Sequence, residues 1–410
     1  MNEFIRLLIS FFTLNFLNKV IPFISIPLLT NRLGIDVFGT YTIVLATIGF
    51  FELLINFGLK TTGVNELILC QSKEKENELF FNVLLIKGAI AFLIIIVVFP
   101  LINFLNLSTV SNYLIYSTPL LVGFVLNQEW FFQAKKKMKA ITIIAVFSRL
   151  SYLVFLFNFV LDSGDLEYAI LAYAGMFFSQ SLLGNIFAIY TYRIKIKIIS
   201  FNVFNLLIRS GYFFISSLNV YLYTGFNYII LGFFYNATLV GLYSIADKIT
   251  NAFKDLVTPF NNSIYPILSE IHSVDTEKYK SISKQYSQYL TLFFIIFPIG
   301  IFFTSELILN FFIKNQSEIN SGKFFLKTLS LGIPINALLS FYTLNFIIKN
   351  KQKQLFKITL FTGIFSILLL GTIGNFLKIE YFVLGNICVL SVLILIVYLK
   401  NTNLKFGIEK

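Results

Sequence analysis

The stretch AFLIIIVVFPLINFL, residues 91–105, decides the fold class of this chain. It is a continuous apolar run and lacks the short alternation of apolar and polar residues that a membrane β-strand requires. Similar runs of about 20 residues recur along the whole sequence, and that is the length a helix needs to cross hydrocarbon. Only 13% of the residues are charged, against roughly a quarter in soluble domains. The sequence therefore predicts an all-α integral membrane protein.

Working outward from this stretch, the apolar runs predict about twelve transmembrane helices. They lie near residues 9–29, 40–59, 80–105, 112–133, 140–161, 167–190, 211–234, 238–268, 286–305, 324–348, 356–377 and 381–399. The eighth is the most polar. The first is long, contains Lys19 and lacks a small-residue cleavage site, so we do not expect a cleaved signal peptide.

The basic residues predict the orientation of these spans. With twelve spans, the loops on one side carry 22 Lys and Arg residues, the other loops carry 5, and five more lie inside spans. Loops rich in Lys and Arg stay in the cytoplasm, so both termini are expected there, in a multi-pass protein of the cytoplasmic (inner) membrane. The net charge of +12 is thus mainly a topology signal, with anionic lipid headgroups as secondary partners and no nucleic acid.

An internal repeat predicts two halves. FGTYTIVLATIGFFELL, residues 38–54, aligns with VGLYSIADKITNAFKDL, residues 240–256, with Gly39 on Gly241 and Tyr41 on Tyr243. The offset of 202 residues is half the chain and keeps the same orientation. It predicts two parallel six-helix lobes, residues 1–200 and 201–410, related by an axis along the membrane normal. A chance match between two apolar segments is the alternative.

Three stretches resemble a known family, the Wzx-type O-antigen flippases. NFLNKVIPFISIPLLTNRLGIDVFGTYTIVLATIGFFELLINFGL is similar to their first two helices, LNQEWFFQAKKKMKAITIIAVFSRL to their fourth and fifth, and LVGLYSIADKI to the start of their eighth. The family belongs to the multidrug/oligosaccharidyl-lipid/polysaccharide exporter superfamily. The resemblance implies a MATE-like bundle around a central cavity. It also implies transport of undecaprenyl-diphosphate-linked oligosaccharide to the periplasmic leaflet for lipopolysaccharide, with polymerase and chain-length proteins as candidate partners.

Ionisable residues inside the spans are the candidate site, because each costs roughly 2.5–3.5 kcal/mol to insert and usually faces a cavity or a partner. A diphosphate cargo needs fixed positive charge in a wet cavity. The candidate cargo-binding residues are Lys19, Arg149, Lys248 and Lys254, and the resemblance adds Arg32 as an exit-side contact. The candidate gating or ion-coupling residues are Asp36, Glu52, Asp247 and Asp255.

Each candidate has a structural alternative. Lys87 lies near a span end and snorkelling explains it, Glu129 fits an interfacial helix end, and Arg32 and Asp36 fit a local pair around a turn. The repeat makes Glu52 equivalent to Lys254. Opposite charges at equivalent positions predict a gate, whereas bonding of each residue within its own lobe is the simpler interpretation.

Other classes of function fit less well. A drug/cation antiporter of the same superfamily would favour acidic cavity residues, whereas the spans hold five basic and four acidic residues. A polymerase or acyltransferase needs a long periplasmic loop or catalytic histidines, and the chain has one histidine, His272. A structural subunit would not need charges in its spans. With Cys70 in a loop and Cys388 in the last span, we expect no disulfide, no metal site, no cofactor and no enzyme activity.

Overall fold

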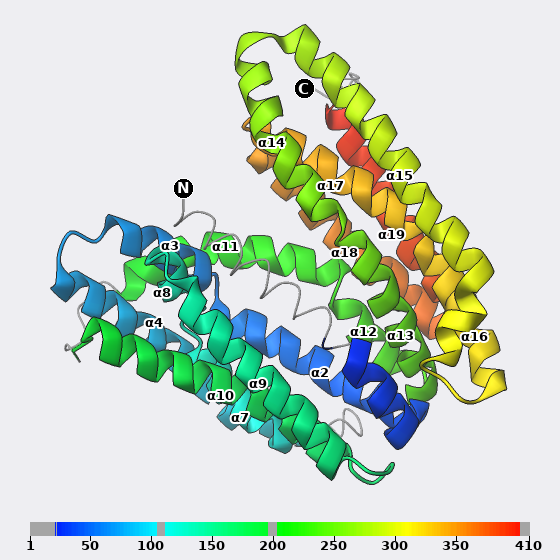
Figure 1. Ribbon diagram of the computed structural model, residues 1–410, viewed down its shortest axis with the longest axis horizontal. Helices are drawn as coiled ribbons and strands as arrows, with labels where there is room; N and C mark the ends of the chain where they lie inside the picture. The colour runs from blue at the N-terminus through cyan, green and yellow to red at the C-terminus, as the bar shows by residue number, and fades with distance from the viewer. Residues whose placement is uncertain (1–20, 22, 105–110, 196–202, 402–410) are drawn as a thin grey trace. The chain divides into compact units, whose positions relative to one another are not determined.

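A computed structural model describes residues 21, 23–104, 111–195 and 203–401. This part of the chain is helical, with short turns and no strand (Figure 1). Nine of its helices are long and apolar enough to cross a membrane, which confirms the all-α integral membrane fold.

The chain divides into two compact units, residues 1–218 and 219–410. The predicted boundary at residues 200 and 201 lies outside the described residues and stays a prediction. The first unit contains α2 (Ile35–Asn56), α3 (Leu59–Leu69), α4 (Lys73–Leu93), α5 (Phe99–Phe104), α6 (Ser111–Leu114), α7 (Thr118–Leu126), α8 (Glu129–Ala134), α9 (Met138–Phe159), α10 (Leu166–Tyr192) and most of α11 (Val203–Tyr223). One π-turn, η1 (Ile94–Val98), joins α4 to α5, and one 3₁₀ turn, η2 (Ile115–Ser117), joins α6 to α7.

In the first unit, α10 packs along α7 and α9, and α2 packs against α4 and α7 (Figure 1). A core of large side chains fills the space where α3, α4, α8 and α9 meet, with Phe80, Trp130, Phe131 and Met138 at most 1% exposed. Gly63 of α3 lies under the Trp130 ring, where a Cβ would come within 2.7 Å of it. This packing fixes the short helix α8 against α3.

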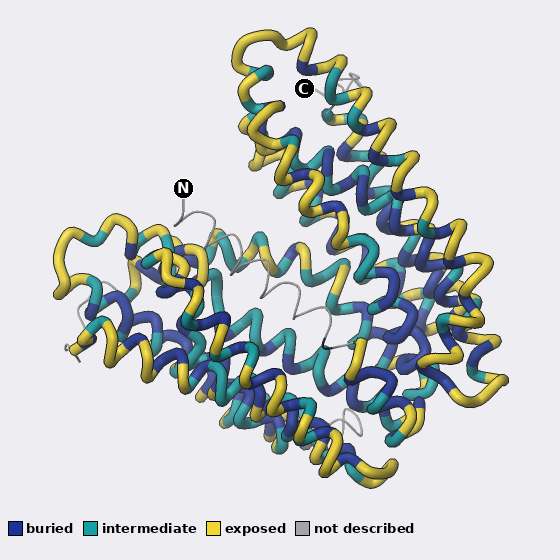
Figure 2. The backbone as a smooth tube through the Cα atoms, in the orientation of Figure 1, coloured by how far each residue is buried: buried dark blue, intermediate teal, exposed yellow. Residues whose placement is uncertain are grey.

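The second unit contains α12 (Phe226–Phe234), α13 (Ala237–Lys254), α14 (Val257–Val274), α15 (Thr276–Asn310), α16 (Gln316–Ser330), α17 (Gly332–Ile348), α18 (Gln352–Phe376) and α19 (Ile379–Asn401). Within it, α17 packs against α14, α15 and α19, and α13 packs against α16. Buried positions follow the inner faces of these helices and exposed positions their outer faces (Figure 2). Apolar side chains such as Phe303 and Leu307 remain exposed on α15, as expected of a surface that faces lipid.

Nine predicted spans overlap the nine membrane-length helices, but the seventh, predicted over 211–234, is interrupted at Thr224 and Gly225, between α11 and α12. Of the other three, the first lies mostly outside the described residues. The fourth is interrupted at Asn127 and Gln128, between α7 and α8, and the eighth at Asp255 and Leu256, between α13 and α14. The expected continuous helix over 238–268 is therefore two helices.

Candidate functional site

Helix α13 carries the polar stripe that the sequence singled out. It begins after Asn236, whose side-chain oxygen accepts a hydrogen bond of 3.0 Å from the backbone N–H of Leu239, as an N-cap residue does. Its apolar side is buried in the second unit and includes Val240, Leu242, Ile245, Ala246 and Ile249. The spacing of four and three residues then places Asp247, Asn251 and Lys254 together on one face.

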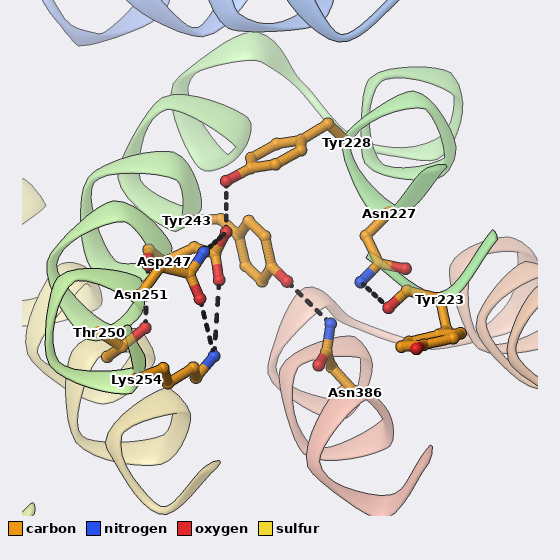
Figure 3. Close-up of polar contacts among 9 residues, drawn as sticks. All are labelled: Tyr223, Asn227, Tyr228, Tyr243, Asp247, Thr250, Asn251, Lys254 and Asn386. Carbon is orange, nitrogen blue, oxygen red and sulfur yellow. Dashed lines mark hydrogen bonds and ion pairs between the residues drawn. The ribbon is translucent and has the colours of Figure 1, made fainter. Parts of the chain in front are cut away.

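These three side chains form a hydrogen-bonded chain with Tyr228 of α12 (Figure 3). The Tyr228 hydroxyl donates to Oδ2 of Asp247 at 2.5 Å, and Nδ2 of Asn251 donates to the same oxygen at 2.9 Å. Nζ of Lys254 donates to Oδ1 of Asn251 at 3.0 Å and lies 4.0 Å from Oδ1 of Asp247. Asn251 thus links the carboxylate to the ammonium group.

The Asp247–Lys254 pair is largely withdrawn from solvent, with side chains 16% and 12% exposed. A pair in this setting is held by its supporting hydrogen bonds as much as by direct attraction, since desolvation opposes the charged state of both partners. Two donors, a phenol and an amide, support the carboxylate. We call Tyr228, Asp247, Asn251 and Lys254 the α13 network.

A second polar contact lies next to the α13 network and involves Tyr243. Nδ2 of Asn386, on α19, donates to the Tyr243 hydroxyl at 2.9 Å, and the rings of Tyr228 and Tyr243 lie 5.7 Å apart, nearly at right angles (Figure 3). Three helices, α12, α13 and α19, therefore position these residues. Sequence reasoning missed Tyr228 and Asn386 because each is an uncharged residue in a mainly apolar run.

Two further candidates lie on or beside α13. Lys248 follows Asp247 and is half-buried, and Asp255 is an exposed residue that ends the helix. Lys19 lies outside the described residues. The roles predicted for all three stay predictions.

Arg149 belongs to a separate polar contact in the first unit. It is 6% exposed, and its Nη1 donates to Oε1 of Gln180 on α10 at 3.0 Å and to the Ala145 carbonyl at 3.1 Å. The residues just before Arg149 and Gln180 also meet, since the hydroxyls of Ser148 and Ser179 are 3.3 Å apart. The sequence singled out Arg149 but not its partner Gln180.

Arg32 contacts the end of a neighbouring helix. Its Nη1 donates to the carbonyls of Leu156, Phe157 and Val160 at 3.2, 2.8 and 2.7 Å, and its guanidinium lies over the Phe157 ring. These carbonyls lie at the C-terminal end of α9, where the Leu156 carbonyl also accepts the backbone N–H of Val160 at 3.2 Å. A cation at this end adds a hydrogen-bond donor and complements the helix dipole. This contact gives Arg32 a structural role within the first unit.

Lys87 makes the same kind of contact. It is 1% exposed and donates to the Asn127 carbonyl at 3.1 Å and the Phe124 carbonyl at 3.5 Å, where α7 ends. It therefore does not snorkel, and this interpretation was wrong: a fully buried lysine caps a helix instead.

The acidic candidates Asp36, Glu52 and Glu129 all lie in the first unit. Glu129 begins α8 and forms an ion pair of 3.0 Å with Lys60 of α3. Asp36 is exposed in the first turn of α2, and Glu52 is half-buried on the same helix. Lys254 bonds within its own helix, so its pairing with Glu52 stays a prediction. No group of three or more His, Cys, Asp or Glu residues in the described chain is placed to hold a metal ion.

Residues 5–272 match the family described as "Polysaccharide biosynthesis protein". The chain belongs to this family. The chain is 26% identical over 365 residues to a "Putative O-antigen transporter" of Shigella dysenteriae, covering 86% of this chain and 88% of that one. It is 30% identical over 268 residues to a protein of the same name from Escherichia coli K12, covering 62% and 61%.

Solved structures confirm the fold. The inward-facing conformation of a multidrug resistance MATE family transporter of the MOP superfamily matches with a TM-score of 0.75 and 14% identity, over 95% of this chain and 96% of that chain. The lipid II flippase MurJ, in an inward closed conformation, matches with a TM-score of 0.73 and 15% identity, over 97% and 87%. The MATE-like helical fold that the resemblance implied is therefore correct.

Proposed function

We propose that this protein is a flippase. It moves an undecaprenyl-diphosphate-linked oligosaccharide, an O-antigen or similar surface-polysaccharide repeat unit, from the cytoplasmic to the periplasmic leaflet of the inner membrane. The observation that carries the proposal is the family match over residues 5–272, supported by two relatives named for O-antigen transport.

The α13 network suits this function in physical terms. A diphosphate that crosses the membrane must exchange its hydration for fixed cationic and hydrogen-bond donor groups. Lys254 offers such a charge but is held by Asn251 and Asp247. We infer that the cargo diphosphate competes with Asp247 for Lys254. When no cargo is bound, Asp247 serves as the counter-ion of Lys254.

Deletion of the gene in its own host tests the proposal. We expect loss of surface polysaccharide and accumulation of the lipid-linked repeat unit in the cytoplasmic leaflet, where enzymes added from the periplasmic side do not reach it. The wild-type chain should restore export. If the lipid-linked unit still reaches the periplasmic leaflet at the normal rate, the proposal is wrong.

A small-molecule antiporter with the same fold is the second candidate. The match to a MATE transporter has 14% identity and supports the fold alone. The same deletion strain separates the two, because an antiporter would leave surface polysaccharide intact and raise sensitivity to cationic drugs.

A further inference from the structure

A groove in the second unit lies outside the α13 network. It has a volume of about 920 Å³ and is formed by the first half of α15, the second half of α17 and the end of α19. The α15 side follows one helical stripe, with Lys280, Lys284, Ser287, Thr291 and Leu292 at spacings of three, four or one. None of the candidates discussed above lines it.

The chemistry of the groove changes along its length. Lys280, Lys284 and Lys349 lie at the end where α15 begins and α17 ends, and Leu292 and Leu338 lie at the other end. The 12 residues from Lys280 to Leu292 span about 18 Å of helix. This is close to the thickness of one leaflet, since the whole hydrocarbon core is about 30 Å thick.

Tyrosines line the boundary between the two ends. The rings of Tyr342 and Tyr398 lie 5.5 Å apart, and Tyr289 of α15 is 72% exposed. Tyrosine is enriched at membrane interfaces because one end of its side chain is apolar and the other polar. The groove therefore has the polarity profile of a single lipid, with charge at one end and hydrocarbon at the other.

Lys349 differs from the other lysines of the groove because it is half-buried and contacts only neutral groups. Its Nζ donates to Oδ1 and to the backbone carbonyl of Asn401, at 2.7 and 3.2 Å, and lies 5.6 Å from the centre of the Tyr279 ring. These contacts are all neutral, and no described carboxylate pairs with it. Burial, and then the charges of Lys351 and Lys280, lower the pKa of Lys349. A half-buried cation in this setting favours an anionic ligand.

The other two lysines leave the charge of the groove positive. Lys280 pairs with Glu277 at 2.6 Å, but both side chains are mostly exposed, so the pair is weak. Lys284 is exposed on the same face one turn further along. Both side chains can turn toward a phosphate at the mouth of the groove.

We propose that this groove binds one anionic glycerophospholipid of the leaflet that the basic loops face. The phosphate lies against Lys284 and Lys349, and the acyl chains run past Tyr289 toward Leu292 and Leu338. A free phosphate would use only the charged end and would leave the apolar half empty. The site is independent of the proposed transport activity and its cargo.

The test measures lipid binding to the purified, delipidated full chain by native mass spectrometry, so it does not depend on transport. The probes are phosphatidylglycerol, zwitterionic phosphatidylcholine, undecaprenyl phosphate and inorganic phosphate. We expect one phosphatidylglycerol to bind at least about tenfold more tightly than phosphatidylcholine. The double variant Lys280→Gln/Lys284→Gln should lose about fivefold in affinity for each lysine removed.

Two further variants keep the test decisive. Lys357→Gln removes an exposed charge from α18, outside the groove, and should bind like the wild type. Lys349→Arg should retain binding and Lys349→Gln should lose it; if Lys349→Gln folds poorly, the exposed double variant decides alone. Equal losses in Lys357→Gln and the double variant would overturn the proposal, and so would preference for undecaprenyl phosphate or complete displacement by inorganic phosphate.

Discussion

At the scale of single residues, a substitution in the α13 network can lower export in two ways, by destabilising the protein or by weakening cargo binding. Lys254 and Asp247 are each largely buried, and they share Asn251 as a hydrogen-bond partner. Removing one charge leaves the other without compensation, which typically costs about 3–5 kcal/mol for a buried pair. A single substitution can therefore abolish export through instability rather than through cargo binding.

We predict that the double variant Asp247→Asn/Lys254→Met distinguishes these effects. Lys254→Met alone should lower the thermal midpoint of the purified protein by several degrees, and the double variant should recover most of that loss because both charges are gone. Export should stay low in both. Recovery of export in step with stability would show that the pair has only a structural role.

Lys248 allows a cleaner test of the cationic site. We predict that Lys248→Ala abolishes surface polysaccharide with normal membrane abundance, that Lys248→Arg restores it in part, and that Lys248→Glu does not, because the lost property is positive charge. Lys19→Ala is predicted to behave in the same way. Normal export by both alanine variants, measured by surface labelling, would exclude these residues.

The sequence identified charged residues better than it identified their partners. A lysine or aspartate in an apolar run is conspicuous because of its insertion cost, so Asp247, Lys254 and Arg149 could be found from sequence alone. Tyr228 and Gln180, which bond to Asp247 and Arg149, gave no such signal. Their contacts depend on the packing of α12 against α13 and of α10 against α9.

At the scale of helices, one pair of helix starts has the spacing of the predicted repeat, while the repeat itself stays a prediction. Helix α2 begins at Ile35 and α13 begins at Ala237, 202 residues later, which is the offset of the sequence match. Both helices are followed by a short break and a further helix, at Phe57 and Gly58 in one unit and at Asp255 and Leu256 in the other. The breaks do not keep the offset of 202, because α2 has 22 residues and α13 has 18.

The breaks themselves could not be predicted from hydropathy. The break after α7 is held by one tertiary and one local contact. Lys87 of α4 donates to the Asn127 carbonyl, and the Asn127 side chain accepts from the backbone N–H of Glu129 at 3.0 Å. A hydropathy profile records only average polarity, and Asn127 and Gln128 change that average little. It therefore gave the spans and missed their interruptions.

The break after α2 gives a third prediction. Gly58 has φ of +73°, and a Cβ there would come within 2.3 Å of the Ser210 carbonyl oxygen on α11. We predict that Gly58→Ala destabilises the protein and lowers its thermal midpoint. Backbone strain at this φ costs about 1–3 kcal/mol, and the close approach to Ser210 adds to that cost.

Gly371→Ala is the matched control, because Gly371 lies in α18 with nothing within 4 Å of an added Cβ. Alanine in place of glycine inside a helix is favourable by up to about 1 kcal/mol, so this variant should melt at or above the wild-type temperature. If both variants melt at the wild-type temperature, the close approach of Gly58 to α11 is absent from the folded protein.

At the scale of the whole molecule, the charge distribution and the helix lengths together predict the orientation of the chain in the membrane. Helix α18 has 25 residues and so spans about 37 Å, enough to place its two ends on opposite sides of a membrane. Lys351 and Lys353 lie at its start, on the basic side, and Lys378 follows its end. The positive-inside rule then predicts that its start is cytoplasmic and its end is periplasmic.

The final prediction tests this orientation in intact cells. In a background without Cys70 and Cys388, a cysteine introduced by Lys378→Cys should react with a membrane-impermeant thiol reagent, and one introduced by Lys351→Cys should react only after the cells are opened. The pair is matched, because both lysines lie in turns next to the same helix. The reverse pattern would place the basic loops outside. It would also move the lysine-lined end of the α15–α17–α19 groove to the periplasmic leaflet, because Lys349 and Lys351 lie in the same turn.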